Sequence, residues 1–402
     1  MNTMFRLAVF IITASFHYST NAQCSNHSLD LFSTVPIKIQ YSFLQVGDVN
    51  GDNRDDVISS QLNGSDSRGT TLYLSSSNGS PGSPIFNSSA PAHPLIVDTS
   101  YRRLAAAAND LAYTGNYTTD TLYVYHLKKW NQLLFLTNQV PHVNLSDVRE
   151  LYDYDYDGFL DIISVTREPP INVNISLGTG GGSFQPTKIL SPNVTTKSNI
   201  TEVAIGNFLG VTPYSGYRRN LGIGRTAYPY PSFTPANISI FYTAKGVKQS
   251  PMHSCDVPSD IGNHVENLFP LKLKDETVIL SQPRQGPMFV LRTKKQPGPV
   301  VYPIEYVCKF SLIPNSHSMF ATIGDLNGDG VNDIVWLRQQ DRQIWYALSD
   351  LDKMPGDWPQ YTLGVSESVE NIAAGYLNSD KLSDLVVKTS TKLLYFKSKC
   401  TE

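Results

Sequence analysis

Short apolar runs alternate with polar segments rich in Gly, Asn, Ser and Asp along most of this chain. The runs are rich in Val, Ile, Leu and Tyr, a composition that predicts β-strands, and the polar segments between them predict tight turns. Tyr is abundant at 22 residues and charged residues make up only 17 % of the chain, which also favours a β-rich protein with many turns. We therefore expect an all-β fold.

Three polar segments share one nine-residue pattern, with Asp or Asn at positions 1, 3, 5 and 9, and an apolar run follows each at once. They span residues 48–56, 153–161 and 325–333 and are called here the first, second and third Asx loops. In a curled backbone the oxygens of positions 1, 3 and 5 turn towards one point. Gly158 and Gly330 at position 6 allow the sharp turn, as does Asn53 in the first loop. Hard oxygen ligands in such a loop predict a Ca²⁺ site in each.

Two other interpretations of these loops were weighed. An EF-hand needs Glu at position 12 and helices on both sides, whereas position 12 is Ser59, Ser164 and Trp336 here and the flanks are β-type. An acidic turn that binds nothing is the remaining alternative. The recurrence of Asp or Asn at the same four positions in three places counts against it. A further copy at residues 376–384 has Tyr376 at position 1, and we do not expect it to bind calcium.

The loops begin at residues 48, 153 and 325, with spacings of about two and three times a unit of roughly 55 residues. Degenerate copies near 109–110, 203–207, 268–273 and 373–387 bring the number of units to seven. Third strands are expected at 72–74, 122–125, 171–176, 238–242, 288–291, 343–347 and 393–396, and a fourth strand after the Gly-rich turn 178–184. Four short antiparallel strands per unit predict a seven-bladed β-propeller, closed by the N-terminal stretch 29–40 joining the last blade. A pair of β-sandwiches is the alternative, and it does not account for the regular spacing.

The start of the chain predicts export. Residues 1–22 look like a signal peptide, with Arg6, an apolar stretch too short to span a bilayer, and small residues ending at Ala22. Residues 23–402 are then expected to form one secreted, extracellular domain with no membrane span. The net charge of −3 gives no electrostatic reason to expect nucleic acid as a partner.

Sequons and cysteines fit an oxidising, secretory environment. The four cysteines, Cys24, Cys255, Cys308 and Cys400, predict two disulfides with three possible pairings, of which Cys24–Cys400 would lock the predicted ring. Ten Asn-x-Ser/Thr sequons predict N-glycosylation, all of them before residue 240. They are Asn26, Asn63, Asn78, Asn87, Asn116, Asn144, Asn174, Asn193, Asn199 and Asn237.

The motif Val46-Gly-Asp-x-Asn-Gly-Asp-x-x-Asp-Asp56 and its copy from Ile323 to Asp333 resemble FG-GAP repeats. These repeats form the seven-bladed propeller at the head of integrin α subunits and occur in other secreted proteins and in fungal lectins. The resemblance covers most of residues 23–402, although leg domains and a transmembrane helix are missing. It implies about three structural calcium ions. Their ligands would be the side chains of Asp48, Asn50, Asp52 and Asp56, of Asp153, Asp155, Asp157 and Asp161, and of Asp325, Asn327, Asp329 and Asp333, with the carbonyls of Arg54, Phe159 and Val331.

In the family that the chain resembles, partners meet the face opposite the calcium loops. The predicted loop 226–235 on that face carries Tyr228, Tyr230 and Phe233 between prolines, a rigid aromatic set suited to a protein or a sugar; packing over a neighbouring blade is the alternative. Arg338 and Arg342 lie in another such loop. No catalytic motif is present, so we expect no enzyme. The leading functional hypothesis is a calcium-stabilised adhesion or recognition module for a protein partner, followed by a lectin and then a propeller lyase or hydrolase; the oligomeric state stays open.

Overall fold

The structure is a computed structural model, and it describes about two thirds of the chain. The described residues are 26–37, 44–48, 50, 52–63, 67–87, 95–96, 111–114, 121–128, 133–141, 148–152, 154, 161–165, 173–180, 183–189, 198–206, 208, 220–227, 237–241, 253–258, 265–273, 276–283, 286–295, 306–350 and 352–401. The proposed signal peptide therefore lies outside the described residues.

Antiparallel strands dominate the described part of the chain, where seven sheets each have four of them. We number these sheets in chain order. Sheet 1 contains β2 (Leu44–Gly47), β3 (Asp56–Asn63), β4 (Ser67–Ser75) and β5 (Pro81–Asn87); sheet 2 contains β6 (Leu95–Ile96), β7 (Leu111–Thr114), β8 (Thr121–Lys128) and β9 (Leu133–Pro141). Sheet 3 contains β10 (Val148–Tyr152), β11 (Asp161–Val165), β12 (Val173–Ser176) and β15 (Lys188–Ile189); sheet 4 contains β16 (Ser198–Gly206), β17 (Asn220–Ala227), β18 (Asn237–Phe241) and β19 (His253–Asp256).

The remaining sheets follow the same plan. Sheet 5 contains β20 (Val265–Lys272), β21 (Thr277–Pro283), β22 (Phe289–Lys295) and β23 (Tyr306–Leu312); sheet 6 contains β24 (Ser318–Gly324), β25 (Asp333–Arg338), β26 (Ile344–Ala347) and β27 (Gln360–Leu363). Sheet 7 contains β28 (Val369–Gly375), β29 (Asp384–Thr389), β30 (Lys392–Thr401) and, as its outer strand, β1 (Asn26–Pro36). The one helical element described is a 3₁₀ turn, η2 (Pro355–Asp357), so the described residues contain no helix that could cross a membrane.

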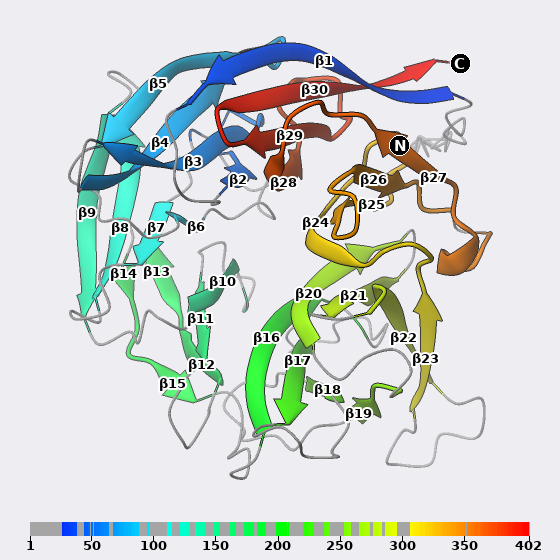
Figure 1. The fold of residues 1–402 in the computed structure, drawn as a ribbon. Coiled ribbons are helices and arrows are strands. Elements are labelled where there is room, and N and C mark those ends of the chain that lie inside the picture. Colours follow the sequence, from blue (N-terminus) through cyan, green and yellow to red (C-terminus); the bar gives the residue numbers. More distant parts are fainter. Residues whose placement is uncertain are drawn as a thin grey trace, which may run out of the picture.

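The sheets are arranged in a ring with a propeller-like appearance (Figure 1). Apolar side chains from neighbouring sheets pack face to face, which places the core between the sheets. Val335 of sheet 6, for example, shares one buried cluster with Val387 of sheet 7, and Ile238 of sheet 4 shares another with Ile279 of sheet 5. An alternating strand presents one face to each neighbour, so both faces of a sheet become apolar.

Sheet 7 joins the two ends of the described chain. β1 pairs with β30 in antiparallel register from Asn26 opposite Thr401 to Pro36 opposite Lys392. Leu29 of β1 is 8 % exposed and packs in the cluster between sheets 6 and 7. On the other side, Tyr395 of β30 packs with Tyr73 of sheet 1. The N-terminal strand thus lies beside the last strand of the chain, as the sequence predicted, although it begins at Asn26.

In sheet 2 the second strand is β7, directly after Asp110, and β8 is the third strand, as expected for residues 122–125. One detail of the predicted strands was wrong. In sheet 3 the Gly-rich turn does not lead straight into the fourth strand. Residues 178–180 and 183–184 form a separate two-stranded hairpin, β13 (Gly178–Gly180) with β14 (Ser183–Phe184), and β15 follows it as the fourth strand.

One backbone hydrogen bond recurs between neighbouring sheets. The residue at position 8 of the loop between first and second strands donates its N–H to a carbonyl of the preceding sheet's loop or strand end. The three described cases are Asn332 to Lys272 (2.9 Å), Ser383 to Asp325 (2.6 Å) and Asp55 to Tyr376 (2.7 Å). The last of these joins sheet 1 to sheet 7, and the Asp55 carboxylate accepts a second bond from the Tyr376 N–H at 2.7 Å.

This contact explains the glycine that precedes position 1 of the loops. A Cβ on Gly375 would collide with Asp55 Oδ2 and lie 2.5 Å from Val46 Cγ1, and one on Gly324 would lie 2.8 Å from the Cβ of Ser383. The position-8 side chain of the next sheet therefore fits only against a residue without a side chain.

Gly375→Ala is expected to lower the free energy of unfolding by about 1–3 kcal/mol, because the new methyl group overpacks the contact between sheets 7 and 1. Gly364→Ala is the matched control, since a Cβ there meets nothing within 4 Å. Urea denaturation of both variants would measure the difference. Equal midpoints for the two variants would show that this contact between sheets tolerates a side chain.

Candidate functional site

The third Asx loop joins β24 to β25, and its side chains hold the loop closed from within. Asp325 accepts hydrogen bonds from the N–H groups of Gly328 (2.7 Å) and Gly330 (2.9 Å). Asn327 accepts one from the N–H of Asp329 at 3.1 Å. Both glycines have φ near +80°, which only glycine adopts readily. The side chains of positions 1 and 3 therefore accept hydrogen bonds from the backbone of their own tight turn.

Asp333, at position 9, anchors the loop to the sheet. Its carboxylate is fully buried and accepts the N–H of Leu326 on Oδ2 and the N–H of Ser349 on Oδ1, both at 2.8 Å. The Ser349 hydroxyl donates in turn to the carbonyl of Asn332 at 2.7 Å. The turn after the third strand is thus bonded to the loop after the first strand, on one face of the ring.

The sequence analysis missed this serine, although it recurs. Ser75 ends the third strand of its sheet, Ser349 follows it and Ser398 lies within β30. Each donates its N–H to the position-9 carboxylate and its hydroxyl to the position-8 carbonyl. A serine at an equivalent place in these three third strands was the available signal. It could have been read from the sequence once the loops were aligned.

The second Asx loop is described only at its ends, and these follow the same plan. Asp161 accepts the N–H of Tyr154 at 2.7 Å and the N–H of Gly178 at 2.8 Å, and both bonds have counterparts at Asp333. The other predicted ligands of this loop, Asp153, Asp155, Asp157 and the Phe159 carbonyl, lie outside the described residues.

The first Asx loop has the same internal bonds and one addition. Asp48 accepts the N–H groups of Asp52 (3.2 Å) and Asn53 (2.8 Å), and Asn53 takes a positive φ of 66° in place of glycine. Asp56 accepts the N–H of Ser75 at 2.8 Å. The addition is an ion pair within the loop, between the Arg54 guanidinium and Asp52 Oδ2.

The loop of sheet 7, residues 376–384, has Tyr376 instead of an acidic residue at position 1, and other side chains hold it closed. Asn378 donates its amide to Asp384 Oδ2 at 2.8 Å, and Asp384 Oδ1 accepts the N–H of Ser398 at 3.0 Å. Burial raises the pKa of Asp384 to about 7, and Asp380 adds to the rise. Lys397 pairs with Asp380 at 3.3 Å.

The donor set of the third loop fits a hard cation. Asp325 and Asn327 are each 8 % exposed, and Asp333 is completely buried. Burial raises the pKa of Asp325 to about 6, with a contribution from the Asp329 carboxylate, and it raises the pKa of Asp333 well above its usual range. Carboxylates that repel one another in a partly desolvated loop gain from a positive ion placed among their oxygens. Calcium is the ion whose preferred ligands these are.

As the side chains stand, they do not gather around one point. Among the described residues no three His, Cys, Asp or Glu side chains lie together as a group that could hold a metal ion. The Asp325 and Asp333 carboxylates face backbone N–H groups, as given above. The remaining oxygen donors of the predicted shell are the Asp329 carboxylate, the Asn327 amide and the Val331 carbonyl.

The opposite face carries the turns between second and third strands and the connections between sheets. There the N–H of Gln339 donates to the carbonyl of His317 at 2.8 Å, and Arg342 donates to the Ser368 hydroxyl at 3.2 Å. Both contacts link a hairpin turn of sheet 6 to the chain that enters or leaves that sheet. The predicted aromatic contacts Tyr228, Tyr230 and Phe233 come between β17 and β18 in the sequence, and they lie outside the described residues.

Arg338 and Arg342 differ in their surroundings. Arg338 pairs with Asp341, and its guanidinium carbon lies 4.3 Å from the centre of the Trp345 ring. Its charge is therefore engaged within its own hairpin. Arg342 has a positive φ of 56° and is exposed on the turn. Of the two arginines, Arg342 is the better placed to meet a partner.

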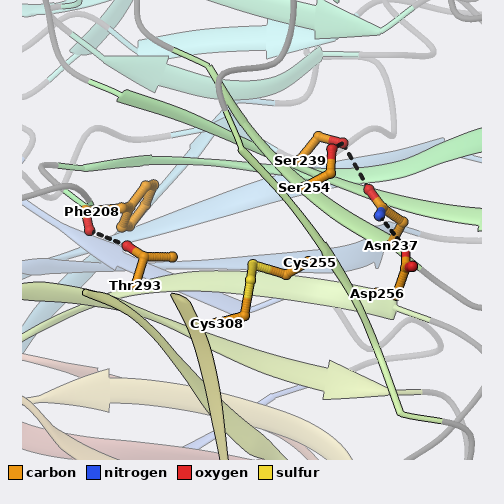
Figure 2. The surroundings of a disulfide bond; sticks show 8 residues. All are labelled: Phe208, Asn237, Ser239, Ser254, Cys255, Asp256, Thr293 and Cys308. Carbon is orange, nitrogen blue, oxygen red and sulfur yellow. Dashed lines mark hydrogen bonds between the residues drawn. A yellow bond between two sulfur atoms is a disulfide. The ribbon is translucent and has the colours of Figure 1, made fainter. Parts of the chain in front are cut away.

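The structure contains one of the possible disulfide pairings. Cys255 on β19 bonds to Cys308 on β23, which ties the outer strands of sheets 4 and 5 together (Figure 2). Close by, the Thr293 hydroxyl donates to the carbonyl of Phe208 at 2.6 Å and links the same two sheets. Cys400 is also disulfide-bonded, and Cys24 lies outside the described residues.

The sequons occupy different environments. Asn78 is exposed on the turn between β4 and β5. Asn237 is half-buried, and its amide donates to Asp256 at 2.7 Å while accepting the Ser239 hydroxyl (Figure 2). Asn174 is half-buried within β12. Asn116, Asn144 and Asn193 lie outside the described residues, as do the side chains of Asn26, Asn63, Asn87 and Asn199.

Comparisons with known proteins add no family to this picture. No protein-family model matches the chain, and no curated protein matches it.

Proposed function

We propose that this chain is a secreted recognition module, a seven-bladed propeller of the FG-GAP type whose calcium loops hold one face rigid while the other face binds a protein partner. The observation that carries the proposal is the repetition of one loop design. The first and third Asx loops occupy the same place in sheets 1 and 6, and the described ends of the second loop repeat the bonds of the third.

Seven four-stranded sheets in the described residues support the blade number, and the bonds between Asp55 and Tyr376 support a closed ring. The Cys255–Cys308 disulfide supports export to an oxidising compartment. The ligands would be the loop residues named above from sequence. When bound, calcium would supply positive charge to the buried carboxylates and nothing more. At the affinities of extracellular sites, about 10⁻⁴ to 10⁻³ M, each ion would add about 0.5–1.5 kcal/mol at millimolar calcium.

The two faces of the ring have different roles in this proposal. On the calcium-loop face the position-9 carboxylates of three loops accept hydrogen bonds from the N–H groups of Ser75, Ser349 and Ser398. On the opposite face exposed polar side chains such as Arg342 surround the connections between sheets. A partner gains most from exposed aromatic and Arg groups on a rigid support, and the loop with Tyr228 and Tyr230 is predicted to belong to this face.

The test is binding to arrays of extracellular proteins and of glycans, with the full-length secreted protein in millimolar calcium. We expect a protein partner, and we expect the triple variant Tyr228→Ala, Tyr230→Ala and Phe233→Ala to lose at least tenfold in affinity while its melting temperature changes by only a few degrees. Lys381→Ala, on the calcium-loop face, is the control and should bind normally. Binding to one glycan class alone would favour the lectin alternative. Equal binding by the triple variant and the control would contradict the proposed surface, and blank arrays from a folded protein would contradict recognition.

A further inference from the structure

The turn between β4 and β5 is built around the side chain of Asn78. Asn78 is exposed, and its Oδ1 accepts the N–H of Ser80 at 2.9 Å and the hydroxyl of Ser76 at 2.6 Å. Gly79 takes a positive φ of 84°, and its N–H donates to the carbonyl of Ser76 at 2.9 Å. The side-chain oxygen of Asn78 therefore faces into the turn, as in an Asx-turn.

The amide nitrogen of Asn78 is left outside these contacts. Because a backbone N–H only donates, the atom that meets Ser80 is the oxygen, and Nδ2 lies on the other side of the planar amide group. Among the described residues none accepts a hydrogen bond from this nitrogen. Asn78, Gly79 and Ser80 also form one of the sequons, so this nitrogen belongs to an acceptor motif for N-linked glycans.

The two other sequons with described Asn side chains are placed differently. The Asn237 amide donates to Asp256 at 2.7 Å, and the hydroxyl of its own sequon, on the buried Ser239, donates to Asn237 Oδ1 (Figure 2). Asn174 is half-buried in β12, an interior strand of sheet 3. A glycan on Asn237 competes with the Asp256 contact and one on Asn174 has to leave from within a sheet, whereas one on Asn78 displaces no hydrogen bond.

The turn that carries Asn78 lies on the calcium-loop face, where sheets 1 and 7 meet. It directly follows Ser75, whose N–H and hydroxyl are bonded to the end of the first Asx loop. A Cβ on Gly79 would lie 3.2 Å from the Cβ of Asn378 and 3.4 Å from Cζ of Phe32, so the turn packs on the loop of sheet 7 and on β1. A group attached to Asn78 therefore stands beside this junction.

We propose that Asn78 carries an N-linked oligosaccharide, which covers the calcium-loop face at the junction of sheets 1 and 7 and leaves the opposite face open to the protein partner. The inference rests on the export that is part of the proposed function, because the sugar donor, a lipid-linked glycosyl diphosphate, is used in the secretory pathway.

The transfer step leaves the turn intact. The bond between the anomeric carbon of the donor and its diphosphate oxygen breaks, and a bond from that carbon to Nδ2 forms. One amide proton is lost, and the lipid diphosphate leaves with the electron pair. The product keeps Oδ1 and one N–H, so the hydrogen bonds from Ser76 and Ser80 remain. A chain modified at Asn78 can therefore fold to this structure.

The test uses the full-length chain secreted from eukaryotic cells. A peptide N-glycosidase converts each glycosylated Asn to Asp in heavy-oxygen water, and mass spectrometry of the peptides then shows which sequons were occupied. We expect the Asn78 peptide to be labelled. Ser80→Ala removes the sequon and leaves Asn78 in place, so this variant should lose the mass of one glycan. Ser80→Thr, the matched control, keeps the sequon and should keep the glycan.

The covering of the face has its own measurement. Lys381 is exposed on the loop of sheet 7, and a bulky amine-reactive reagent should label it faster in Ser80→Ala than in Ser80→Thr. Equal rates would overturn the covering. An unlabelled Asn78 in the secreted protein would overturn the inference and leave the proposed function standing. A chain that is not exported and carries no glycan at all would contradict both.

Discussion

Asp333→Ala is expected to lower the free energy of unfolding by about 3–5 kcal/mol, both in calcium and in EDTA. The substitution leaves the buried N–H groups of Leu326 and Ser349 without their acceptor, and each unsatisfied group costs about 1–3 kcal/mol. It also removes the link between the two kinds of turn on the calcium-loop face. Denaturant unfolding monitored by tryptophan fluorescence would measure the loss.

The variant Asp329→Ala tests metal binding separately from the structural anchoring by Asp333. Asp329 is half-buried and bonds only within its own loop, to Asn327 and Val331, so its loss should change stability little in EDTA. In millimolar calcium it should remove the increment of about 0.5–1.5 kcal/mol expected for one site. If the Asp333 variant were no less stable than the Asp329 variant in EDTA, position 9 would not be the structural anchor described here.

Leu29→Asp is expected to destabilise the protein by about 4 kcal/mol or more, and to shift part of it into aggregates. The side chain is 8 % exposed between sheets 6 and 7, and a carboxylate placed there is buried without a partner. The effect also reaches the pairing of β1 with β30, because a strand whose buried face carries a charge no longer docks. The fraction of monomer in size-exclusion chromatography and the urea midpoint would report both effects.

Leu31→Asp is the control on the same strand. Leu31 is 55 % exposed, so its replacement should change stability by no more than about 0.5 kcal/mol. Similar losses in the two variants would mean that β1 is not packed on one face as the structure shows.

The repeat could be predicted from sequence because the Asx loops are local. The Asp and Asn residues of each loop and the apolar run that follows it lie within a dozen residues. The strands β3, β11 and β25 begin where the motifs end. The N-terminal strand was also predicted, since the last unit ran out of chain after its third strand. The second strand of sheet 2, β7, was not predicted, because the Asx pair at 109–110 before it does not extend into the full loop pattern.

The contacts between loops could not be predicted from one motif at a time. Asp55 matters because its carboxylate and N–H meet Tyr376, which lies 321 residues further along the chain. Gly375 is required because of Asp55, and Ser349 because of Asp333. The Arg54 pair was missed for a different reason, since position 7 had been considered only for its carbonyl.

The pairing of β1 with β30 also has a consequence for biosynthesis. β1 is made before the strands of sheets 1 to 6 and its partner β30 is made after them, so these sheets can form while β1 has no neighbour. An unpaired strand is a template for pairing with other chains, and closing so long a loop is slow. The nascent protein is therefore exposed to aggregation until β30 has been made and can pair with β1. Its yield should depend on molecular chaperones more than its final stability does.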